Sequence, residues 1–164
     1  MGTTQIKILI AEDSLANQMI FLRMLKQFGL SADVVSTGLE ALMAVMIYKY
    51  DIVFMDDSMP DMDGVEATRL ILKSHQVNEC PKIIALTANS MINDRERCID
   101  AGMDDYLTRP VRLEEVMSVL NRWVPALVMS EATTISQKTV PHVETARKQY
   151  VPHAAPVFRL AHAG

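Results

Sequence analysis

Polar side chains follow four of the short apolar runs in this sequence, at the point where each run ends. These residues are Glu12 and Asp13, Asp56 and Asp57, Thr87, and Arg109, which come after apolar runs at 6–11, 51–55, 82–86 and 105–107. Carboxylates that pack together repel one another, and burying them adds a desolvation cost. The simplest counter-charge is a hard divalent cation, and Mg²⁺ accepts one or two carboxylates, water and a phosphate. The pattern predicts a magnesium site, provided that the fold brings these ends together.

Each of these residues also has a simpler interpretation. A single acid after a strand commonly serves loop solubility or caps a helix, and Asp13 or Ser14 would do so in any protein. Thr87 alone is also typical of a cap. A matched set at four strand ends is much rarer, and this favours a functional site.

The apolar runs alternate with longer segments of helical periodicity. We expect strands at 6–11, 32–35, 51–55, 82–86 and 105–107, and helices at 14–28, 38–48, 64–73, 91–101 and 113–124. The residues expected on buried helix faces are Leu15, Met19, Leu22 and Leu25 in the first helix, Leu39, Leu42, Val45 and Met46 in the second, and Leu113, Val116, Val119, Leu120 and Trp123 in the fifth. Gly29 should end the first helix, because glycine tolerates the left-handed conformation there.

Five successive strand–helix units predict an α/β fold. Such units form a parallel sheet with helices on both faces. Right-handed crossovers then favour a doubly wound sheet, in which sites lie outside the carboxyl ends of the strands. The polar residues described above occupy those ends.

Four segments, spread over roughly residues 5 to 124, resemble the motifs of bacterial response-regulator receiver domains. They are Ile8-Leu-Ile-Ala-Glu-Asp13, Asp51-Ile-Val-Phe-Met-Asp-Asp-Ser-Met-Pro-Asp-Met-Asp-Gly64, Ile83-Ile-Ala-Leu-Thr-Ala-Asn89 and Asp105-Tyr-Leu-Thr-Arg-Pro110. The resemblance implies a flavodoxin-like sheet of five parallel strands in the order 2-1-3-4-5, flanked by five helices. It also implies a receiver domain over 1–124.

The resemblance assigns a role to each polar residue. Asp56, four residues before Pro60, would accept a phosphoryl group, and this spacing selects it over its neighbour Asp57. The ligands of Mg²⁺ would be carboxylate oxygens of Asp13 and Asp56, the backbone carbonyl of Ser58, and Glu12 through water. Thr87 would bind phosphoryl oxygens. Tyr106 matches the switch aromatic that swings inward when Thr87 moves, although a domain that does not switch would hold an ordinary half-buried tyrosine there.

Arg109 departs from the family pattern, which has lysine before the proline of this loop. Arginine also binds phosphate and can do so with two nitrogens, but its planar guanidinium is less compact than an ammonium. We expect Arg109 to support phosphorylation as a phosphate ligand while coupling it less well to the switch.

The resemblance also implies a function in a two-component phosphorelay. The domain would take a phosphoryl group from the phosphohistidine of a histidine kinase or histidine phosphotransfer domain and switch the face built by the fourth helix, fifth strand and fifth helix. It would be a self-catalysed phosphoacceptor and not a turnover enzyme. Leu86-Thr-Ala-Asn89 and Asp63-Gly-Val-Glu-Ala-Thr-Arg69 favour the receivers of hybrid histidine kinases.

Composition sets further expectations. A net charge of −4 argues against direct nucleic-acid binding, since such domains carry a basic face. No apolar stretch approaches the length of a membrane span, and the two cysteines indicate reduced thiols, so we expect a cytoplasmic protein, with a monomer favoured. Residues 125–164 contain four prolines and three of the four histidines without zinc-like spacing, which predicts a flexible tail.

Two alternatives remain open on the sequence. A degenerate receiver would bind a partner without being phosphorylated, and Arg109 is its main support. An enzyme of the haloacid-dehalogenase type also forms an aspartyl phosphate after a strand, but it needs Asp-x-Asp at the end of the first strand, where this chain has Glu12-Asp13.

Overall fold

The predicted parallel sheet is confirmed by a computed structural model, which describes residues 6–74, 80–88 and 92–124. Its strands are β1 (Ile8–Ala11), β2 (Ala32–Val35), β3 (Ile52–Asp56), β4 (Lys82–Thr87) and β5 (Asp105–Thr108). All pairs are parallel, and the strand order is β2-β1-β3-β4-β5. The strands β1, β3 and β4 are almost wholly buried, as expected for strands covered on both faces.

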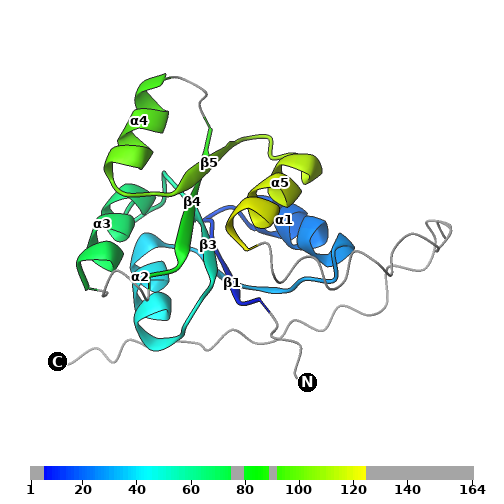
Figure 1. Ribbon diagram of the computed structural model, residues 1–164. Coiled ribbons are helices and arrows are strands. Elements are labelled where there is room, and N and C mark those ends of the chain that lie inside the picture. Colours follow the sequence, from blue (N-terminus) through cyan, green and yellow to red (C-terminus); the bar gives the residue numbers. More distant parts are fainter. Residues whose placement is uncertain (1–5, 75–79, 89–91, 125–164) are drawn as a thin grey trace, which may run out of the picture.

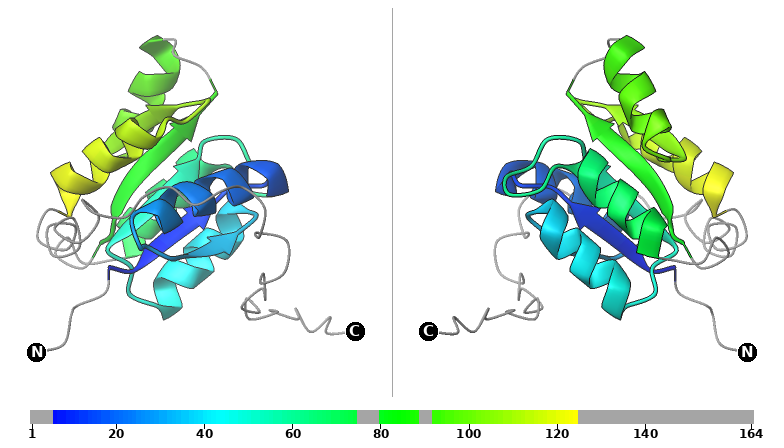
Figure 2. Two further views of the ribbon diagram at one scale, coloured as in Figure 1. Left: turned by 90° about the vertical axis from the view of Figure 1, so that its right-hand side faces the viewer. Right: turned by 90° about the vertical axis from the view of Figure 1, so that its left-hand side faces the viewer.

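Five helices cover the two faces of the sheet. They are α1 (Leu15–Gln27), α2 (Gly38–Ile47), α3 (Gly64–Ser74), α4 (Ile92–Asp100) and α5 (Leu113–Trp123). Helices α1 and α5 lie on one face, and α2, α3 and α4 lie on the other (Figure 1). The two side views show the same division (Figure 2). The molecule is therefore doubly wound, as the sequence predicted.

Each face of the sheet has its own hydrophobic core. Alternate strand residues point to opposite faces, so neighbours in one strand enter different cores. Leu9 and Val53 pack in the core under α2, α3 and α4, whereas Ile10 and Phe54 pack in the core under α1 and α5. Phe54 also contacts Phe21 of α1, with ring centroids 4.7 Å apart.

The predicted inner face of α1 is wrong in part. Leu15 and Met19 are 73% and 56% exposed, and the buried residues are Gln18, Phe21 and Leu25. The sequence places leucine and methionine on both sides of this helix, so apolar periodicity alone selects the wrong stripe. The buried stripe combines the apolar packing of Phe21 and Leu25 with a polar contact, in which the Gln18 amide donates to the backbone carbonyl of Glu12 at 2.6 Å.

The predicted inner face of α2 needs a similar correction. Leu39 and Met46 are exposed, and the helix packs through Gly38, Ala41, Ala44 and Val45. Small side chains bring this helix close to β1 and α3, and the larger ones are left outside. In α5, by contrast, the predicted Val116, Val119 and Leu120 are buried, with Leu113 and Trp123 partly so.

Two glycines hold the chain in positions that a side chain would not fit. Gly29 ends α1 with φ 71°, as predicted. Gly64 begins α3 directly against the end of β3, where an added Cβ would overlap the backbone oxygen of Asp56. The tight junction at Gly64 sets the course of the loop that leaves the candidate phosphoacceptor.

Both cysteines, and all the helices compared with the expected absence of a membrane span, lie within the described ranges. Neither Cys80 nor Cys98 forms a disulfide, and Cys98 is buried. Within the described ranges, none of the helices combines the length and apolar character that a membrane span needs. The predicted tail at 125–164, and the predicted start of the fourth helix at Met91, lie outside the described residues.

Candidate functional site

The sheet brings the predicted strand ends together. Asp56 is the last residue of β3 and Thr87 the last residue of β4, so both side chains come from the strands themselves. Glu12 directly follows β1, and Arg109 directly follows β5. A backbone hydrogen bond of 2.8 Å from Arg109 N to the Thr87 carbonyl fixes the last of these. The peptide bond from Arg109 to Pro110 is cis.

Three carboxylates form an acidic cluster at this edge. Glu12, Asp13 and Asp56 each offer an oxygen within 4.8 Å of the others. Glu12 and Asp56 are buried, and Asp13 is exposed. Such a set of hard oxygen donors, open to solvent on the Asp13 side, suits a divalent cation such as Mg²⁺.

Arg109 supplies the counter-charge in the described structure. Its Nη2 lies 2.7 Å from Glu12 Oε2 and 2.7 Å from Asp56 Oδ2. The contact with Glu12 has hydrogen-bond geometry. Arg109 therefore joins the ends of β1 and β3 from the end of β5, and one positive charge faces two buried negative charges.

The two oxygens of Asp56 have different surroundings. Oδ1 accepts a hydrogen bond of 3.0 Å from the Ser58 N–H. Oδ2 is buried and accepts no well-aligned hydrogen bond from the described residues, although Arg109 lies close to it. Burial raises the pKa of Asp56, and the Ser58 N–H and Arg109 offset part of that rise. An incompletely satisfied buried oxygen on a residue of the acidic cluster fits a metal or phosphoryl ligand.

Helix α1 holds Glu12 in place through residues that the sequence analysis missed. Glu12 Oε1 accepts hydrogen bonds from Ser14 N at 3.1 Å and from Asn17 Nδ2 at 3.2 Å. Gln18 binds the Glu12 backbone and also donates to Ser36 Oγ at 3.3 Å. The only sequence signal was a pair of adjacent amide side chains near the start of α1.

Asp57 lies apart from the acidic cluster. It is half-buried and is not among the three residues whose oxygens approach one another. Burial raises the pKa of Asp57, while a hydrogen bond with Thr87 lowers it. Two adjacent carboxylates in an extended segment project in different directions, which gives them different partners.

Tyr106 of β5 lies beside the core under α4. It is partly buried, and the guanidinium carbon of Arg95 lies 4.5 Å from its ring centroid. A cation over an aromatic face is a favourable contact, so Arg95 holds the ring in its described position. The sequence gave no indication of this partner, because Arg95 and Tyr106 meet only through the packing of α4 on β5.

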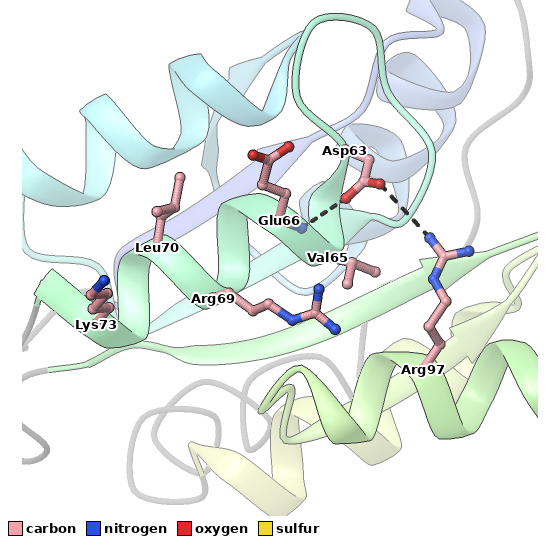
Figure 3. Close-up of a pocket in the computed structure, with 7 residues that line it drawn as sticks. All are labelled: Asp63, Val65, Glu66, Arg69, Leu70, Lys73 and Arg97. Carbon is pink, nitrogen blue, oxygen red and sulfur yellow. Dashed lines mark hydrogen bonds and ion pairs between the residues drawn. The ribbon is translucent and has the colours of Figure 1, made fainter.

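A shallow groove lies between α3 and α4 (Figure 3). Asp63 Oδ1 accepts a hydrogen bond of 2.7 Å from Glu66 N at the start of α3, and Asp63 Oδ2 lies 3.9 Å from Arg97 Nη2 of α4. The lining residues are Asp63, Val65, Glu66, Arg69, Leu70, Lys73 and Arg97. None of them belongs to the acidic cluster, so the groove does not contain the site.

Comparisons with known proteins agree with this geometry. The family model for the response regulator receiver domain matches residues 8–121. Hybrid signal transduction histidine kinase K of Dictyostelium discoideum is 37% identical over 121 residues, which cover 70% of this chain and 10% of that kinase. The chain spans between 4% and 16% of the length of the first curated relatives. The similarity therefore concerns one part of much longer proteins.

Two solved structures show the same fold. The receiver domain of the sensor histidine kinase PA1611 from Pseudomonas aeruginosa PAO1, crystallised with a magnesium ion in its active-site cleft, is 38% identical with a TM-score of 0.68; the match covers 74% of this chain and 99% of that one. A second match is to the Saccharomyces cerevisiae complex of the histidine phosphotransfer protein Ypd1 with the receiver domain of Ssk1, at 26% identity and a TM-score of 0.68, over 82% of this chain and 97% of that one. With the doubly wound sheet and its acidic edge, these matches establish that the chain belongs to the response regulator receiver domain family.

Proposed function

We propose that this domain accepts a phosphoryl group on Asp56 from a phosphohistidine in a two-component phosphorelay. One observation carries the proposal: Asp56 belongs to the acidic cluster, and its Oδ2 atom is buried with Arg109 as its nearby cation. A carboxylate oxygen with a cation beside it suits phosphoryl transfer, because this reaction depends mainly on positioning and charge neutralisation.

In the proposed reaction, Asp56 Oδ2 attacks the phosphorus atom of the donor phosphohistidine. A new P–O bond forms, the P–N bond breaks, and its electron pair stays on the donor imidazole. A magnesium ion held by Asp13, Asp56 and the Ser58 carbonyl, with Glu12 reached through water, would neutralise charge on the phosphoryl oxygens. Arg109 would contact one of those oxygens, and the Thr87 hydroxyl would donate to another.

The acyl phosphate carries about two negative charges where the carboxylate carried one, and this change next to Thr87 favours a second arrangement of the neighbouring elements. Thr87 would move towards the phosphoryl group, and Tyr106 would turn inward. Arg95 is then the contact that Tyr106 must leave. The face that changes is built from α4, β5 and α5, and it would carry the signal to a partner.

The proposed donor is a histidine kinase or a histidine phosphotransfer domain. The relatives are histidine kinases, and one structural neighbour is the Ssk1 receiver domain in complex with the phosphotransfer protein Ypd1. The domain is a signalling module, and we propose that it catalyses only its own phosphorylation. A cytoplasmic location, a monomeric state and the absence of direct nucleic-acid binding stay predictions.

A second candidate is a receiver that binds its partner without phosphorylation. Arg109 favours it, because its guanidinium already compensates Glu12 and Asp56 without a phosphoryl group. Incubation with acetyl phosphate and Mg²⁺, followed by intact mass spectrometry, separates the two. We expect one added phosphoryl group on the wild type and on Asp57→Asn, and none on Asp56→Asn.

Borohydride reduction and peptide mapping then locate the label. A label on Asp57 would contradict the choice of Asp56. A wild-type chain that gains no mass, from acetyl phosphate or from a phosphorylated phosphotransfer domain, would support the phosphorylation-independent receiver. For Arg109→Lys we expect a phosphorylation rate within roughly tenfold of wild type, about 1.4 kcal/mol on the barrier. Arg109→Ala should be slower, since that side chain provides the described cation at the site.

A further inference from the structure

The first turn of α1 holds one oxygen of the Glu12 carboxylate. This oxygen, Oε1, accepts hydrogen bonds from the Ser14 N–H at 3.1 Å and from Asn17 Nδ2 at 3.2 Å. The Glu12 side chain is only 3% exposed, so little water can replace a donor that is lost. The Asn17 amide is the side-chain donor of the pair, and a substitution can therefore remove it while the backbone donor stays in place.

The cap of α1 determines where the Asn17 amide lies. Ser14 caps this helix, and its Oγ accepts a hydrogen bond of 3.5 Å from the Asn17 N–H. The buried Gln18, which is the next residue, donates to the backbone carbonyl of Glu12 at 2.6 Å. The first turn of α1 is therefore tied to the end of β1, and the amide meets the carboxylate at a fixed place.

The orientation of Glu12 matters for the acidic cluster. Glu12, Asp13 and Asp56 are the residues whose oxygens lie within 4.8 Å of one another. A carboxylate that reaches Mg²⁺ through water must point in a defined direction, because this ion demands near-octahedral geometry. Partners that orient metal-binding groups by hydrogen bonds are typically worth roughly 10–100-fold in metal affinity or activity. With Oε1 committed to α1, the other oxygen of Glu12 is left for the cluster.

We infer that Asn17 is a positioning residue for the divalent cation, because its amide holds the Glu12 carboxylate in the orientation that reaches the metal-bound water. The inference rests on the metal site of the proposed function and adds to it a residue that lies on a helix, away from the strand ends. Asn17 acts through Glu12 and does not touch the metal. The metal site therefore depends on the position of α1 as well as on the sheet.

The test is Mg²⁺ titration of the full chain by isothermal calorimetry at fixed ionic strength. Asn17→Leu removes the donor and keeps the size of the side chain. We expect it to bind Mg²⁺ roughly three- to tenfold more weakly than wild type, at the low end for an orienting partner, because the Ser14 N–H still holds Oε1. Asn17→Gln keeps an amide donor on a longer stem, and it should recover most of the lost affinity.

Asn121→Leu is the matched control. It makes the same substitution at an exposed asparagine in the last turn of α5. Trp123, in the same turn, donates to Asp105 at the start of β5, which is the edge of the sheet opposite to the acidic cluster. Asn121→Leu should therefore bind Mg²⁺ as wild type does.

A second measurement follows the hydrogen bond in the wild-type chain. The side-chain amide signals of Asn17 in a proton–nitrogen NMR spectrum are identified by their absence in Asn17→Leu. An amide proton bonded to a buried carboxylate should exchange with solvent more slowly than those of Asn121, and this protection should persist at saturating Mg²⁺. Exchange as fast as that of Asn121 at saturating Mg²⁺ would mean that Asn17 releases Glu12 when the metal binds, which overturns the inference.

The calorimetric outcomes separate this inference from the proposed function. Wild-type affinity in Asn17→Leu, or equal weakening in Asn17→Leu and Asn121→Leu, would overturn the role of Asn17 and leave the metal site standing. Asn17→Gln that binds as weakly as Asn17→Leu would show that the donor is not what matters, and this also overturns it. If wild type does not bind Mg²⁺, the metal site of the proposed function fails, and the inference fails with it.

Discussion

Replacing Asp56 with asparagine should stabilise the metal-free domain, although it removes the proposed phosphoacceptor. Asparagine has the same shape, and its Oδ1 can still accept the hydrogen bond from the Ser58 N–H, while its Nδ2 faces Arg109, whose guanidinium shifts towards Glu12, which still accepts its hydrogen bond. The change removes one of two buried negative charges that share a single arginine. The folded state therefore loses a charge that it compensates only partly.

The size of the expected gain in the free energy of unfolding follows from three contributions: repulsion by Glu12, attraction by Arg109 and the desolvation of Asp56. Glu12 Oε2 and Asp56 Oδ2 each lie 2.7 Å from the same nitrogen, so they are at most twice 2.7 Å, or 5.4 Å, apart. At an effective dielectric constant of about 20, their repulsion is about 3 kcal/mol, and the attraction of Arg109 to Asp56 is about 4 kcal/mol at a charge separation of roughly 4 Å. These two terms nearly cancel. The desolvation of Asp56, several kcal/mol for a buried ion, then decides the sign. Allowing for relaxation of the site, we expect a gain of about 1–3 kcal/mol.

Urea unfolding followed by the fluorescence of Trp123, the only tryptophan, measures this gain. With EDTA at pH 7, Asp56→Asn should unfold at higher urea, and the exposed control Asp61→Asn should match wild type. Mg²⁺ at ten times its dissociation constant stabilises wild type by about 1.4 kcal/mol. It should therefore narrow the difference in unfolding free energy between wild type and Asp56→Asn. An Asp56→Asn variant that is less stable than wild type in EDTA would refute the reasoning.

The pH dependence gives an independent check on the same carboxyl. Burial raises the folded-state pKa of Asp56 above its ordinary value of 3.8. Below that ordinary value the carboxyl is protonated in both folded and unfolded chains, so the folded state carries no penalty. As the pH rises, the unfolded chain ionises first, and stability falls until the pH has passed the raised folded pKa. The extra stability of Asp56→Asn over wild type should therefore be small at acid pH and reach its full size at neutral pH.

Three further predictions concern packing around the site. Gly64→Ala should destabilise the domain by roughly 3 kcal/mol or more in urea unfolding, because its Cβ would overlap the backbone at the end of β3; an unchanged midpoint would contradict the tight junction. At pH 8 a thiol reagent should label Cys80 first and Cys98 only on unfolding, since burial raises the pKa of Cys98 to about 11; equal rates would argue against this. Arg95→Ala should free the Tyr106 ring, which would appear as averaged NMR shifts of its aromatic protons. The domain should also lose about 0.5–1 kcal/mol of stability. Unchanged shifts would show that Arg95 does not hold the ring.

Much of the site could be predicted because it depends on residue types and their spacing along the chain. The alternation of apolar runs and helical segments indicated a parallel sheet, and parallel strands place their carboxyl ends on one edge. The sequence alone therefore groups Glu12, Asp13, Asp56 and Arg109 at one edge of the sheet. The structure places them within ion-pair or metal-ligand distance of one another.

Other features of the site could not be predicted, because they depend on how elements pack in three dimensions. Apolar periodicity selected Leu15 and Met19 for the inner face of α1, yet both are exposed, and the buried face carries Phe21, Leu25 and Gln18 with its hydrogen bond to the Glu12 backbone. The stacking of Arg95 on Tyr106 likewise depends on the packing of α4 against β5.

The sequence by itself determined the fold class, the strand ends and the identity of the charged groups, since these follow from residue type and spacing along the chain. Only the tertiary structure decided how the charges are shared. One nitrogen of Arg109 reaches both Glu12 and Asp56 because β1, β3 and β5 end at the same edge of the sheet. Asp56 Oδ2 is buried there and has no second partner among the described residues. Both facts depend on distances across the sheet, which spacing along one chain does not contain.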